Sequence, residues 1–359
     1  ITATVIIRRG ETLFRGESAE KWPFDMDFPP EKSRCKTKTA FSSLYSISRQ
    51  MQDRKPGGGC VFGRYVIKWE KRWEMPDMKQ LIVIADMEGA SGIFDANREA
   101  CRHEERYPQY KLWRAYGRSC ITSDVLAVCN AAVDAGIDDI LLYDMHFAGC
   151  TESNVELDKL PACVRVFDLP NRETLWDRIR GQAAMEPYGI ITVGQHARNG
   201  EANAYFPHTI HTPPIESFFI NGIHVAEIGE SVMCFSGVPY IANIGCAASH
   251  KEALELSPEV SCITVKDKAK HWEPLPEDTY PLIYAGVRKA LGDYESKTAF
   301  PPLDRYVCKL NLTEDHFFDA PDNFPWKGTF DGRSAQWEAH DILTALSLFW
   351  QVHNYIRKQ

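Results

Sequence analysis

Two carboxylates directly follow an apolar run that begins near residue 80. The run 81–85 reads Leu-Ile-Val-Ile-Ala and is followed by Asp86 and, two positions later, by Glu88. An uninterrupted, β-branched apolar run is typical of a strand buried on both faces of a parallel sheet. Side chains at i and i+2 of an extended segment point the same way, so Asp86 and Glu88 are predicted to project together from the carboxyl end of the strand. Open α/β folds bind their ligands at that edge.

Two further apolar runs end near a possible metal ligand. The run 140–143 leads to His146, and the run 189–194 leads to His196. Neighbouring parallel strands end at the same edge of a sheet, so these side chains are predicted to lie within reach of Asp86 and Glu88. A third carboxylate, Glu227, follows a hairpin, and on spacing alone Glu216 and Glu230 are alternatives to it.

These donors predict a metal site. Carboxylates and imidazoles are ligands that suit zinc, and five of them suit one or two ions with one carboxylate bridging. The set is Asp86, Glu88, His146, His196 and Glu227. A pair of metal ions activates water and polarises a carbonyl, which is hydrolytic chemistry. Any single member is more readily explained by a structural role, but three strand ends that each carry a donor are harder to reach by chance.

Other nucleophiles and bases fit less well. His208 and His211 lie on the loop leaving the third apolar run, and one of them could act as a general acid or base, although His211 is better explained as a surface histidine. Cys101 and Cys120 have no apparent histidine partner, and Ser91 lacks the G-x-S-x-G elbow of a serine hydrolase.

Composition narrows the class of protein. The chain has 359 residues and a net charge of -8, which argues against a nucleic-acid partner. No apolar run approaches the roughly 18 residues that a membrane span requires, and no signal peptide is expected. The 11 cysteines form no C-x-x-C pair, and several, such as Cys129, Cys262 and Cys308, lie in apolar settings. We therefore expect reduced, buried thiols in a cytoplasmic protein.

The order of predicted elements indicates an α/β fold. Hydrophobic spacing predicts helices over 119–135, 174–184, 228–236, 249–255 and 280–291 and a long closing helix over 336–356. Further strands are predicted over 238–244, 262–265 and 306–310, with hairpins around Arg9-Gly10 and Asn221-Gly222. We expect a mostly parallel sheet flanked by helices, with the metal site at the carboxyl edge of its strands. The predicted domains are an N-terminal extension of short strands and loops over 1–78, an α/β metal-binding catalytic domain over 79–268, and a smaller C-terminal α+β domain over 269–359.

Over about residues 80–350 the chain resembles the D-aminopeptidase family of zinc peptidases. The motifs that carry the resemblance occur in the family's order: Asp86-Met87-Glu88-Gly89 with Ser91-Gly92, Asp144 to His146, Gly194-Gln195-His196-Ala197-Arg198, Pro207-His208-Thr209, Glu227-Ile228-Gly229-Glu230, and Ala335 to Ala339 entering the last helix. The resemblance implies two zinc ions per chain on the five ligands named above, with Asp86 bridging. It also implies a catalytic role for His208, a homo-oligomer such as a ring-stacked decamer, and short peptide substrates with an N-terminal D-residue.

The chain departs from the family at Gly245-Cys246-Ala247, where the family carries acidic residues. Cys246 and Ala247 offer no carboxylate to a free α-amino group. The expected function is a zinc-dependent hydrolase that cleaves an amide or peptide bond of a small substrate, with a metal-bound hydroxide as nucleophile and His208 as acid, base or transition-state stabiliser. The alternatives are an amidohydrolase specialised in tailoring a peptide natural product, a non-catalytic metal-stabilised binding or scaffold protein and, more weakly, a metal-dependent phosphatase.

Overall fold

The chain divides into two compact units, Ile1–Pro76 and Asp77–Gln359. The computed structural model describes residues 4–8, 11–15, 59–62, 65–68, 79–95, 99, 110–146, 153–167, 180–184, 186–210, 213–320 and 326–359. In the first unit these form two hairpins, β1 (Thr4–Arg8) with β2 (Glu11–Arg15) and β3 (Gly59–Phe62) with β4 (Tyr65–Lys68). The hairpin predicted around Arg9-Gly10 is therefore present.

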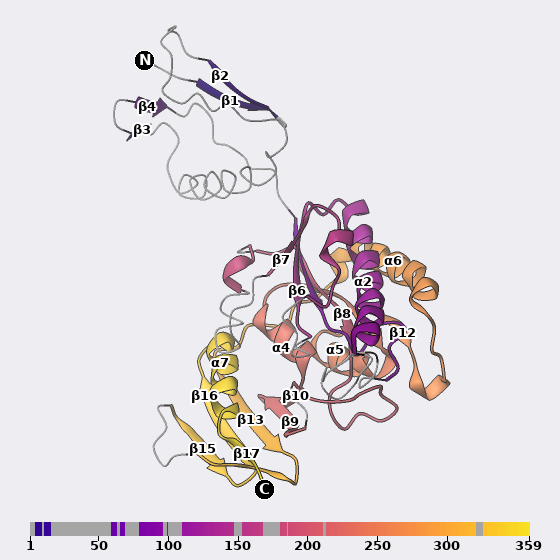
Figure 1. The fold of residues 1–359 in the computed structure, drawn as a ribbon. Coiled ribbons are helices and arrows are strands. Elements are labelled where there is room, and N and C mark those ends of the chain that lie inside the picture. Colours follow the sequence, from indigo (N-terminus) through magenta and orange to yellow (C-terminus); the bar gives the residue numbers. More distant parts are fainter. Residues whose placement is uncertain are drawn as a thin grey trace. The chain divides into compact units, whose positions relative to one another are not determined.

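A six-stranded parallel sheet forms the centre of the second unit (Figure 1). Its strands are β5 (Gln80–Ala85), β6 (Asp139–Asp144), β7 (Val164–Val166), β8 (Gly189–Gln195), β11 (Tyr240–Cys246) and β12 (Ser261–Lys266). They lie in the order β12-β11-β8-β5-β6-β7, and every pairing is parallel. From β5 the chain adds β6 and β7 on one side, and from β8 it adds β11 and β12 on the other. The boundary between β5 and β8 is thus a topological switch point, where α/β folds place their ligands.

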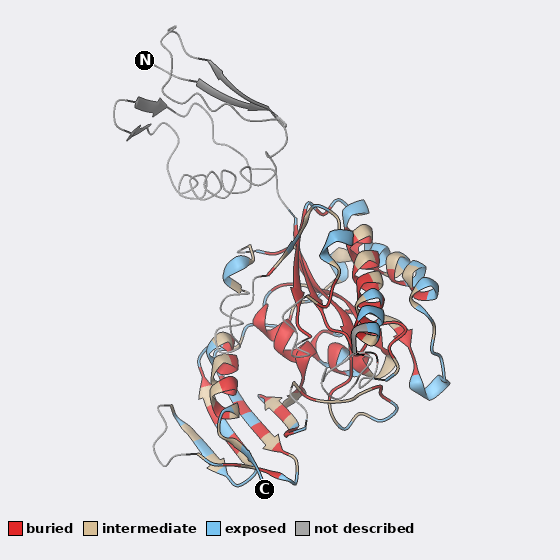
Figure 2. Cartoon of the chain, in the orientation of Figure 1, coloured by how far each residue is buried: buried red, intermediate tan, exposed pale blue. Residues whose placement is uncertain are grey.

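Helices cover both faces of this sheet, which confirms the predicted architecture. One face packs against α2 (Tyr110–Asp134) and α6 (Pro276–Gly292), and the other against α4 (Glu227–Cys234) and α5 (His250–Leu256). Alternation along β5 explains the two layers, because Leu81 and Val83 join the cluster under α2 while Ile82 and Ile84 join the cluster under α4. The central strands are buried throughout, and the outer sides of α2 and α6 are exposed (Figure 2).

A second, antiparallel sheet follows the order β10-β9-β13-β16-β15. Its strands are β9 (Ile215–Ile220), β10 (Ile223–Val225), β13 (Tyr306–Leu312), β15 (Gly328–Asp331) and β16 (Ser334–Ala339). The hairpin β9–β10 turns at Asn221-Gly222, as predicted. This sheet takes strands from both sides of residue 268. The domain boundary expected at residue 268, between the catalytic and the C-terminal domain, stays a prediction. A short ribbon pairs β14 (His316–Phe318) with β17 (Ile356–Lys358), and single turns η2 (Leu157–Lys159), η3 (Ala247–Ser249), η4 (Lys268–Lys270) and η5 (Tyr294–Ser296) connect other elements.

The long helix predicted over 336–356 is wrong at its start. Residues up to Ala339 form β16, and α7 (Ile342–His353) begins only after them. Along β16 the side chains of Ala335, Trp337 and Ala339 are buried, a period of two that strand pairing with β13 and β15 imposes. Asp341 then starts the helix, because its carboxylate accepts a hydrogen bond from Thr344 N at 2.8 Å.

Of the other expectations from the sequence, some are confirmed and some are wrong. Helix α2 begins at Tyr110 rather than at residue 119, and most of the helix predicted over 174–184 lies outside the described residues. Cys129 and Cys308 are buried free thiols, but Cys262 is exposed, contrary to expectation, because β12 is an edge strand.

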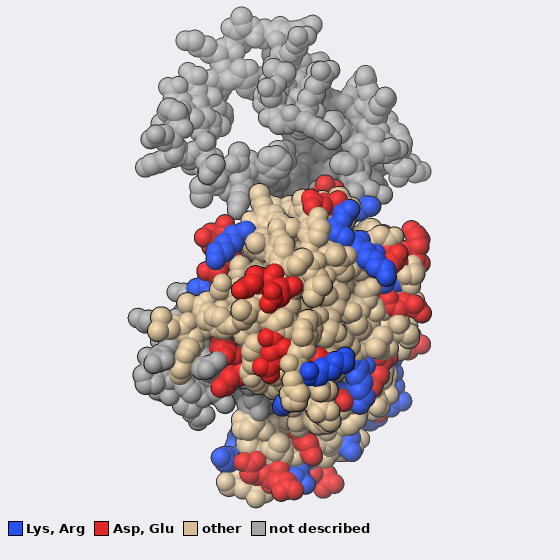
Figure 3. Space-filling model, turned by 90° about the vertical axis from the view of Figure 1, so that its right-hand side faces the viewer, with Lys and Arg blue, Asp and Glu red and all other residues tan. Residues whose placement is uncertain are grey.

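No helix in the described ranges is long and apolar enough to cross a membrane. On the face drawn in Figure 3, the described basic and acidic side chains are interspersed.

Candidate metal centre

The three strand ends singled out by the sequence lie side by side. Strands β6, β5 and β8 are consecutive in the sheet, so the segments leaving them start at one edge. Backbone hydrogen bonds continue past the strand ends, from Met145 N to Ala85 O at 2.8 Å and from Asp86 N to Val193 O at 2.9 Å. The loop carrying Asp86 is thereby held between the segments that carry His146 and His196.

The predicted donor side chains converge at this edge. His196 Nε2 lies 3.3 Å from Asp86 Oδ2 and 3.3 Å from Glu227 Oε1. His146 Nδ1 lies 3.0 Å from Glu88 Oε2. The donor atoms form two groups, and within each group they all lie within 4.8 Å of one another. One group is Asp86 with Glu88 and His196, and the other is His196 with His208 and Glu227. His196 belongs to both groups, and His146 contacts the first through Glu88 and, at 3.5 Å, Asp86.

Helix α4 brings Glu227 to the cluster, because Glu227 is its first residue. Of the three carboxylates that spacing left open, Glu227 is the one within 4 Å of His196 and His208. Glu216 is exposed on β9. The N-terminus of α4 has Ala226 at its cap position, which offers no side-chain acceptor. Glu252 of α5 takes that role, since its Oε1 accepts from Ala226 N and Gly229 N, both at 2.7 Å.

The arrangement around His196 fits a bound cation. Its Nδ1 lies 2.9 Å from the carbonyl oxygen of Ala197, which can only accept, so the Nδ1 proton is placed there. When the ring is neutral, the opposite nitrogen, Nε2, carries a lone pair that faces two carboxylate oxygens, and this nitrogen has no hydrogen-bond partner among the described residues. A lone pair that faces two buried anions is repulsive unless a proton or a metal cation lies between them. This is the strongest single sign of a metal site in the structure.

The pKa values express the same excess of negative charge. Burial, and then the charge of Glu88, raises the pKa of Asp86 to about 6. Although burial opposes it, the carboxylates of Glu88 and Asp86 raise the pKa of His146 to about 10. Glu227 and Asp86 likewise raise the pKa of His196 above its ordinary value, against the effect of burial. The same carboxylates and imidazoles that attract protons here would bind a divalent cation in competition with those protons.

His208 lies beside this cluster rather than within a strand end. Its ring stacks on His196 with centroids 3.8 Å apart and an angle of 13° between the planes. Its Nδ1 bonds to the carbonyl oxygen of Phe206 at 2.8 Å, so Nε2 faces the donors, 3.6 Å from Glu227 Oε1 and 3.9 Å from Glu88 Oε1. The ring is thus fixed in plane and in tautomer. His211 lies outside the described residues.

A glycine makes the close approach of two strand ends possible. Gly194 has a φ of +73°, in the left-handed region, and a Cβ there would lie 2.0 Å from the carbonyl oxygen of Asp86. Neither the backbone conformation nor the space admits another residue without a shift.

Several supporting residues were not singled out by the sequence. Asp144 is no member of the donor groups; it accepts from Asn154 N at 2.6 Å, and Asn154 Nδ2 in turn donates to His146 O at 2.5 Å. Arg198 pairs with Glu255 at 2.7 and 2.9 Å, which ties the segment after β8 to α5. Only position within motifs, one residue or two from a donor, could have signalled Asp144 and Arg198. Nothing in the sequence marked Asn154.

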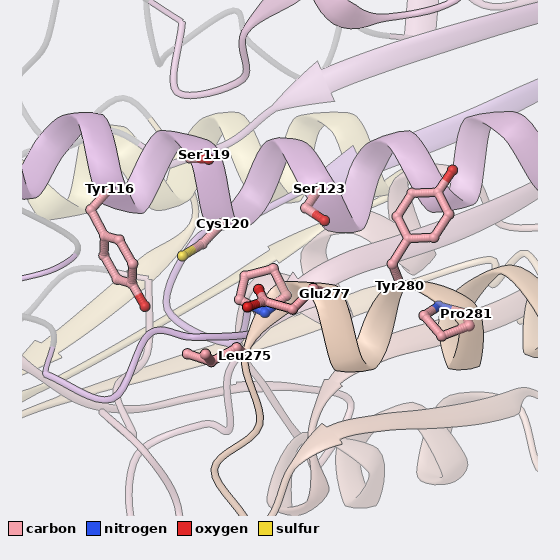
Figure 4. Close-up of a pocket in the computed structure, with 9 residues that line it drawn as sticks. Tyr116, Ser119, Cys120, Ser123, Leu275, Glu277, Tyr280 and Pro281 are labelled. Carbon is pink, nitrogen blue, oxygen red and sulfur yellow. The ribbon is translucent and has the colours of Figure 1, made fainter.

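The alternative nucleophiles are not supported. Cys120 lies in a pocket between α2 and α6 that contains none of the metal donors, where Tyr116 and Ser123 of α2 face Leu275 and Tyr280 (Figure 4). Burial raises the pKa of the Cys120 thiol to about 12, so it is not a thiolate near neutral pH. Ser91 is buried and hydrogen-bonded to Asp124, and Cys101 lies outside the described residues.

Two comparisons with known proteins found a match. The family model described as D-aminopeptidase matches residues 78–351. A solved structure, the Zn-dependent D-aminopeptidase DppA from Bacillus subtilis, described as a self-compartmentalizing protease, superposes with a TM-score of 0.61. That match has 19% sequence identity and covers 77% of this chain and 97% of DppA, so it shows a shared fold. No curated protein sequence matches the chain. By the extent of the family match, the chain belongs to the D-aminopeptidase family of peptidases.

Proposed function

We propose that this peptidase-family enzyme is a zinc-dependent hydrolase that cleaves an amide or peptide bond of a small substrate. Asp86, Glu88, His146, His196 and Glu227 would hold two zinc ions per chain. The observation that carries the proposal is the unbonded Nε2 of His196, which faces two buried carboxylates. The zinc dependence of DppA supports the choice of metal. When bound, a pair of zinc ions supplies an activated water and polarises a substrate carbonyl.

The chain's own residues would orient the substrate and move the proton. His208 has its Nδ1 committed to Phe206 O, so Nε2 is the atom that can accept or deliver a proton toward the donor cluster. Stacking on His196 keeps that nitrogen at a fixed distance from the site. We assign to His208 the protonation of the leaving amine or the stabilisation of the tetrahedral transition state. The donors are nearly fully buried, which limits water around a bound substrate.

The substrate is proposed to be a short peptide or amino-acid amide, with no nucleic-acid or membrane partner. The family name points to an N-terminal D-residue. Cys246, the last residue of β11, and Ala247, which follows it, provide no carboxylate for a free α-amino group. Cys246 packs in an apolar cluster with Ala197, Ala204 and Tyr205. This favours a second candidate of the same chemistry, an amidohydrolase that acts on substrates whose amine is blocked, as in the tailoring of a peptide natural product.

Assembly and compartment are part of the proposal. The self-compartmentalizing character of DppA supports a homo-oligomer, such as a ring or decamer, which sedimentation velocity would measure directly. Free thiols at Cys120, Cys129, Cys234 and Cys308 support a reducing, cytoplasmic location.

Metal content and turnover, measured on the same preparations, test the function. We expect about two zinc per chain by mass spectrometry, as the five ligands imply. His196→Ala should lose metal and activity together, because it removes the ring nitrogen that faces the carboxylates of Asp86 and Glu227. His208→Ala should keep its metal and lose turnover on D-amino-acid amides and short peptides. The exposed His340 provides the control, and His340→Ala should keep both.

Two outcomes would contradict the proposal. If the wild-type protein takes up no zinc, the proposed hydrolase function is wrong, and a binding or scaffold protein of the same fold is the remaining explanation. A fully active His208→Ala variant would remove the role assigned to His208. Comparing free and N-acylated forms of each substrate then separates the two substrate classes.

A further inference from the structure

Lys266 ends strand β12, and its side chain is fully enclosed, with 0% of its surface exposed. Its Nζ donates hydrogen bonds to three backbone carbonyl oxygens, those of Glu88 at 2.6 Å, Ala90 at 2.9 Å and Ile93. An ammonium group has three N–H donors, so each has a partner. All three acceptors belong to the loop that follows β5 and carries Asp86 and Glu88. The loop therefore curls around the ammonium group.

Aromatic rings complete the enclosure. The Nζ of Lys266 lies 5.6 Å from the ring centroid of Phe94, 5.1 Å from that of Tyr205 and 5.4 Å from that of Phe206. The face of an aromatic ring attracts a cation, and more strongly where water is excluded. Burial lowers the pKa of Lys266 to about 8, and carbonyl dipoles and ring faces offset part of that cost, while its hydrogen bonds go to no carboxylate.

These contacts join two segments of the proposed active site. The carbonyls belong to the loop with Asp86 and Glu88, whereas Tyr205 and Phe206 lie three and two positions before His208. The carbonyl oxygen of Phe206 holds the Nδ1 of His208 at 2.8 Å. Lys266 therefore touches both the segment that presents two proposed ligands and the segment that orients the proposed acid or base.

A buried carboxylate also holds this loop. Asp124 of α2 accepts from Ser91 N at 2.9 Å and from Ser91 Oγ at 3.1 Å. One amide of the loop thus points to a carboxylate while three carbonyls point to an ammonium. Without Lys266 these carbonyls would converge on a space that offers no donor, which is unfavourable for buried acceptors and lets their dipoles repel one another.

We propose that Lys266 is a positioning residue for the hydrolytic reaction: its ammonium group acts as an internal cation that fixes the Asp86–Ile93 loop and the Tyr205–His208 segment relative to each other. This inference rests on the proposed function for its catalytic consequence. The positioning itself follows from the contacts alone, so the two can fail separately.

Charge-specific rescue tests the role. Lys266→Ala removes three methylene groups and the ammonium, which n-propylammonium matches in length and charge, and 1-propanol matches in size without charge. The variant is refolded from urea with zinc and with either additive, so that a variant that folds only with propylammonium still gives a result. Hydrogen–deuterium exchange of peptides covering 86–93 and 204–208 reports the order of both segments without reference to activity. The readouts for the reaction are kcat, KM and zinc content.

We expect Lys266→Met and Lys266→Ala to exchange faster in both segments, and kcat to fall about 100-fold with little change in KM, because misplacement by about 1 Å costs that much in a preorganised site. Propylammonium should restore slow exchange and part of kcat in Lys266→Ala, and propanol should not. The matched control is Lys289→Met, since Lys289 is an exposed lysine of α6 and belongs to neither of the two segments. It should behave as wild type.

Wild-type exchange and kcat in Lys266→Met would overturn the inference. Equal rescue by propanol would also overturn it, because filling space would then suffice. If the wild-type protein proves to bind no zinc and to cleave nothing, the proposed function fails, and exchange with its charge-specific rescue still decides the positioning role.

Discussion

Replacing Glu252 by glutamine should change how the free energy of unfolding depends on pH. The Glu252 side chain is buried, with one oxygen capping α4 and the other, Oε2, without a hydrogen-bond partner in the described part of the chain. Burial is the main reason that its pKa rises from an ordinary value of 4.5 to about 7, although the two backbone amides act in the opposite direction. Glutamine has the same shape, keeps the accepting oxygen and does not titrate in this range.

The sign and size follow from linkage. The folded state binds this proton more tightly than the unfolded state does, so stability is lost as pH rises from 4.5 to about 7. Each factor of ten in proton affinity corresponds to about 1.4 kcal/mol, so a pKa difference of about 2.5 gives roughly 3 kcal/mol. Between pH 4.5 and 8, the wild-type free energy of unfolding should therefore fall by about 3 kcal/mol relative to that of Glu252→Gln.

Urea unfolding at several pH values measures this difference directly. The protein is treated with EDTA, so that metal release contributes no protons at any pH. Glu255→Gln on the same helix is the matched control. The hydrogen bond from Arg198 lowers the pKa of Glu255 below its ordinary value of 4.5. The contribution of Glu255 to the free energy of unfolding is therefore lost only as the pH falls below 4.5. Its curve should run parallel to wild type between pH 5 and 8. A Glu252→Gln curve that is also parallel to wild type, or steeper, would refute the reasoning.

Two further predictions concern the site itself. Gly194→Ala should destabilise the protein and lose metal, because left-handed backbone alone costs about 1–2 kcal/mol and the new Cβ would meet Asp86 O at 2.0 Å. Gly237 also has a positive φ, of +86°, but nothing lies within 4 Å of a Cβ built there. Gly237→Ala should therefore lose only the smaller, backbone part of the free energy of unfolding, measured with urea, and keep its metal. Removing metal with EDTA should lower the melting temperature in differential scanning fluorimetry. If the free metal had been at a thousand times its Kd, its removal costs about 4 kcal/mol of stability. Adding zinc back should reverse the change, and an unchanged melting temperature would count against a buried cation.

The parallel sheet and its functional edge could be predicted from sequence because the signals are local. The runs 81–85, 140–143 and 189–194 are apolar and β-branched without alternation, and strands buried on both faces are where such runs are stable. A donor just past the end of each run needs only the parallel direction to reach the same edge. The hairpin at Asn221-Gly222 was equally local, because its turn residues adopt the required backbone angles.

Long-range contacts explain what local signals missed. Residues 336–339 have no intrinsic feature that distinguishes them from the start of the following helix, and only pairing with β13 and β15 makes them a strand. Lysine is almost never fully buried, so the general expectation for any lysine, Lys266 included, is a solvent-exposed side chain. Three carbonyls from a loop 173 to 178 positions earlier in the chain reverse that expectation.

By itself, then, the sequence determined the α/β class, the strand ends and the donor types at this edge, because apolar runs and side-chain chemistry are properties of short segments. Only the tertiary structure decided which carboxylate faces His196, how Glu252 caps the helix that carries Glu227, and that Lys266 lies enclosed behind the loop with Asp86. Each of these depends on contacts between segments far apart in the chain, and their geometry is set by packing rather than by any local pattern.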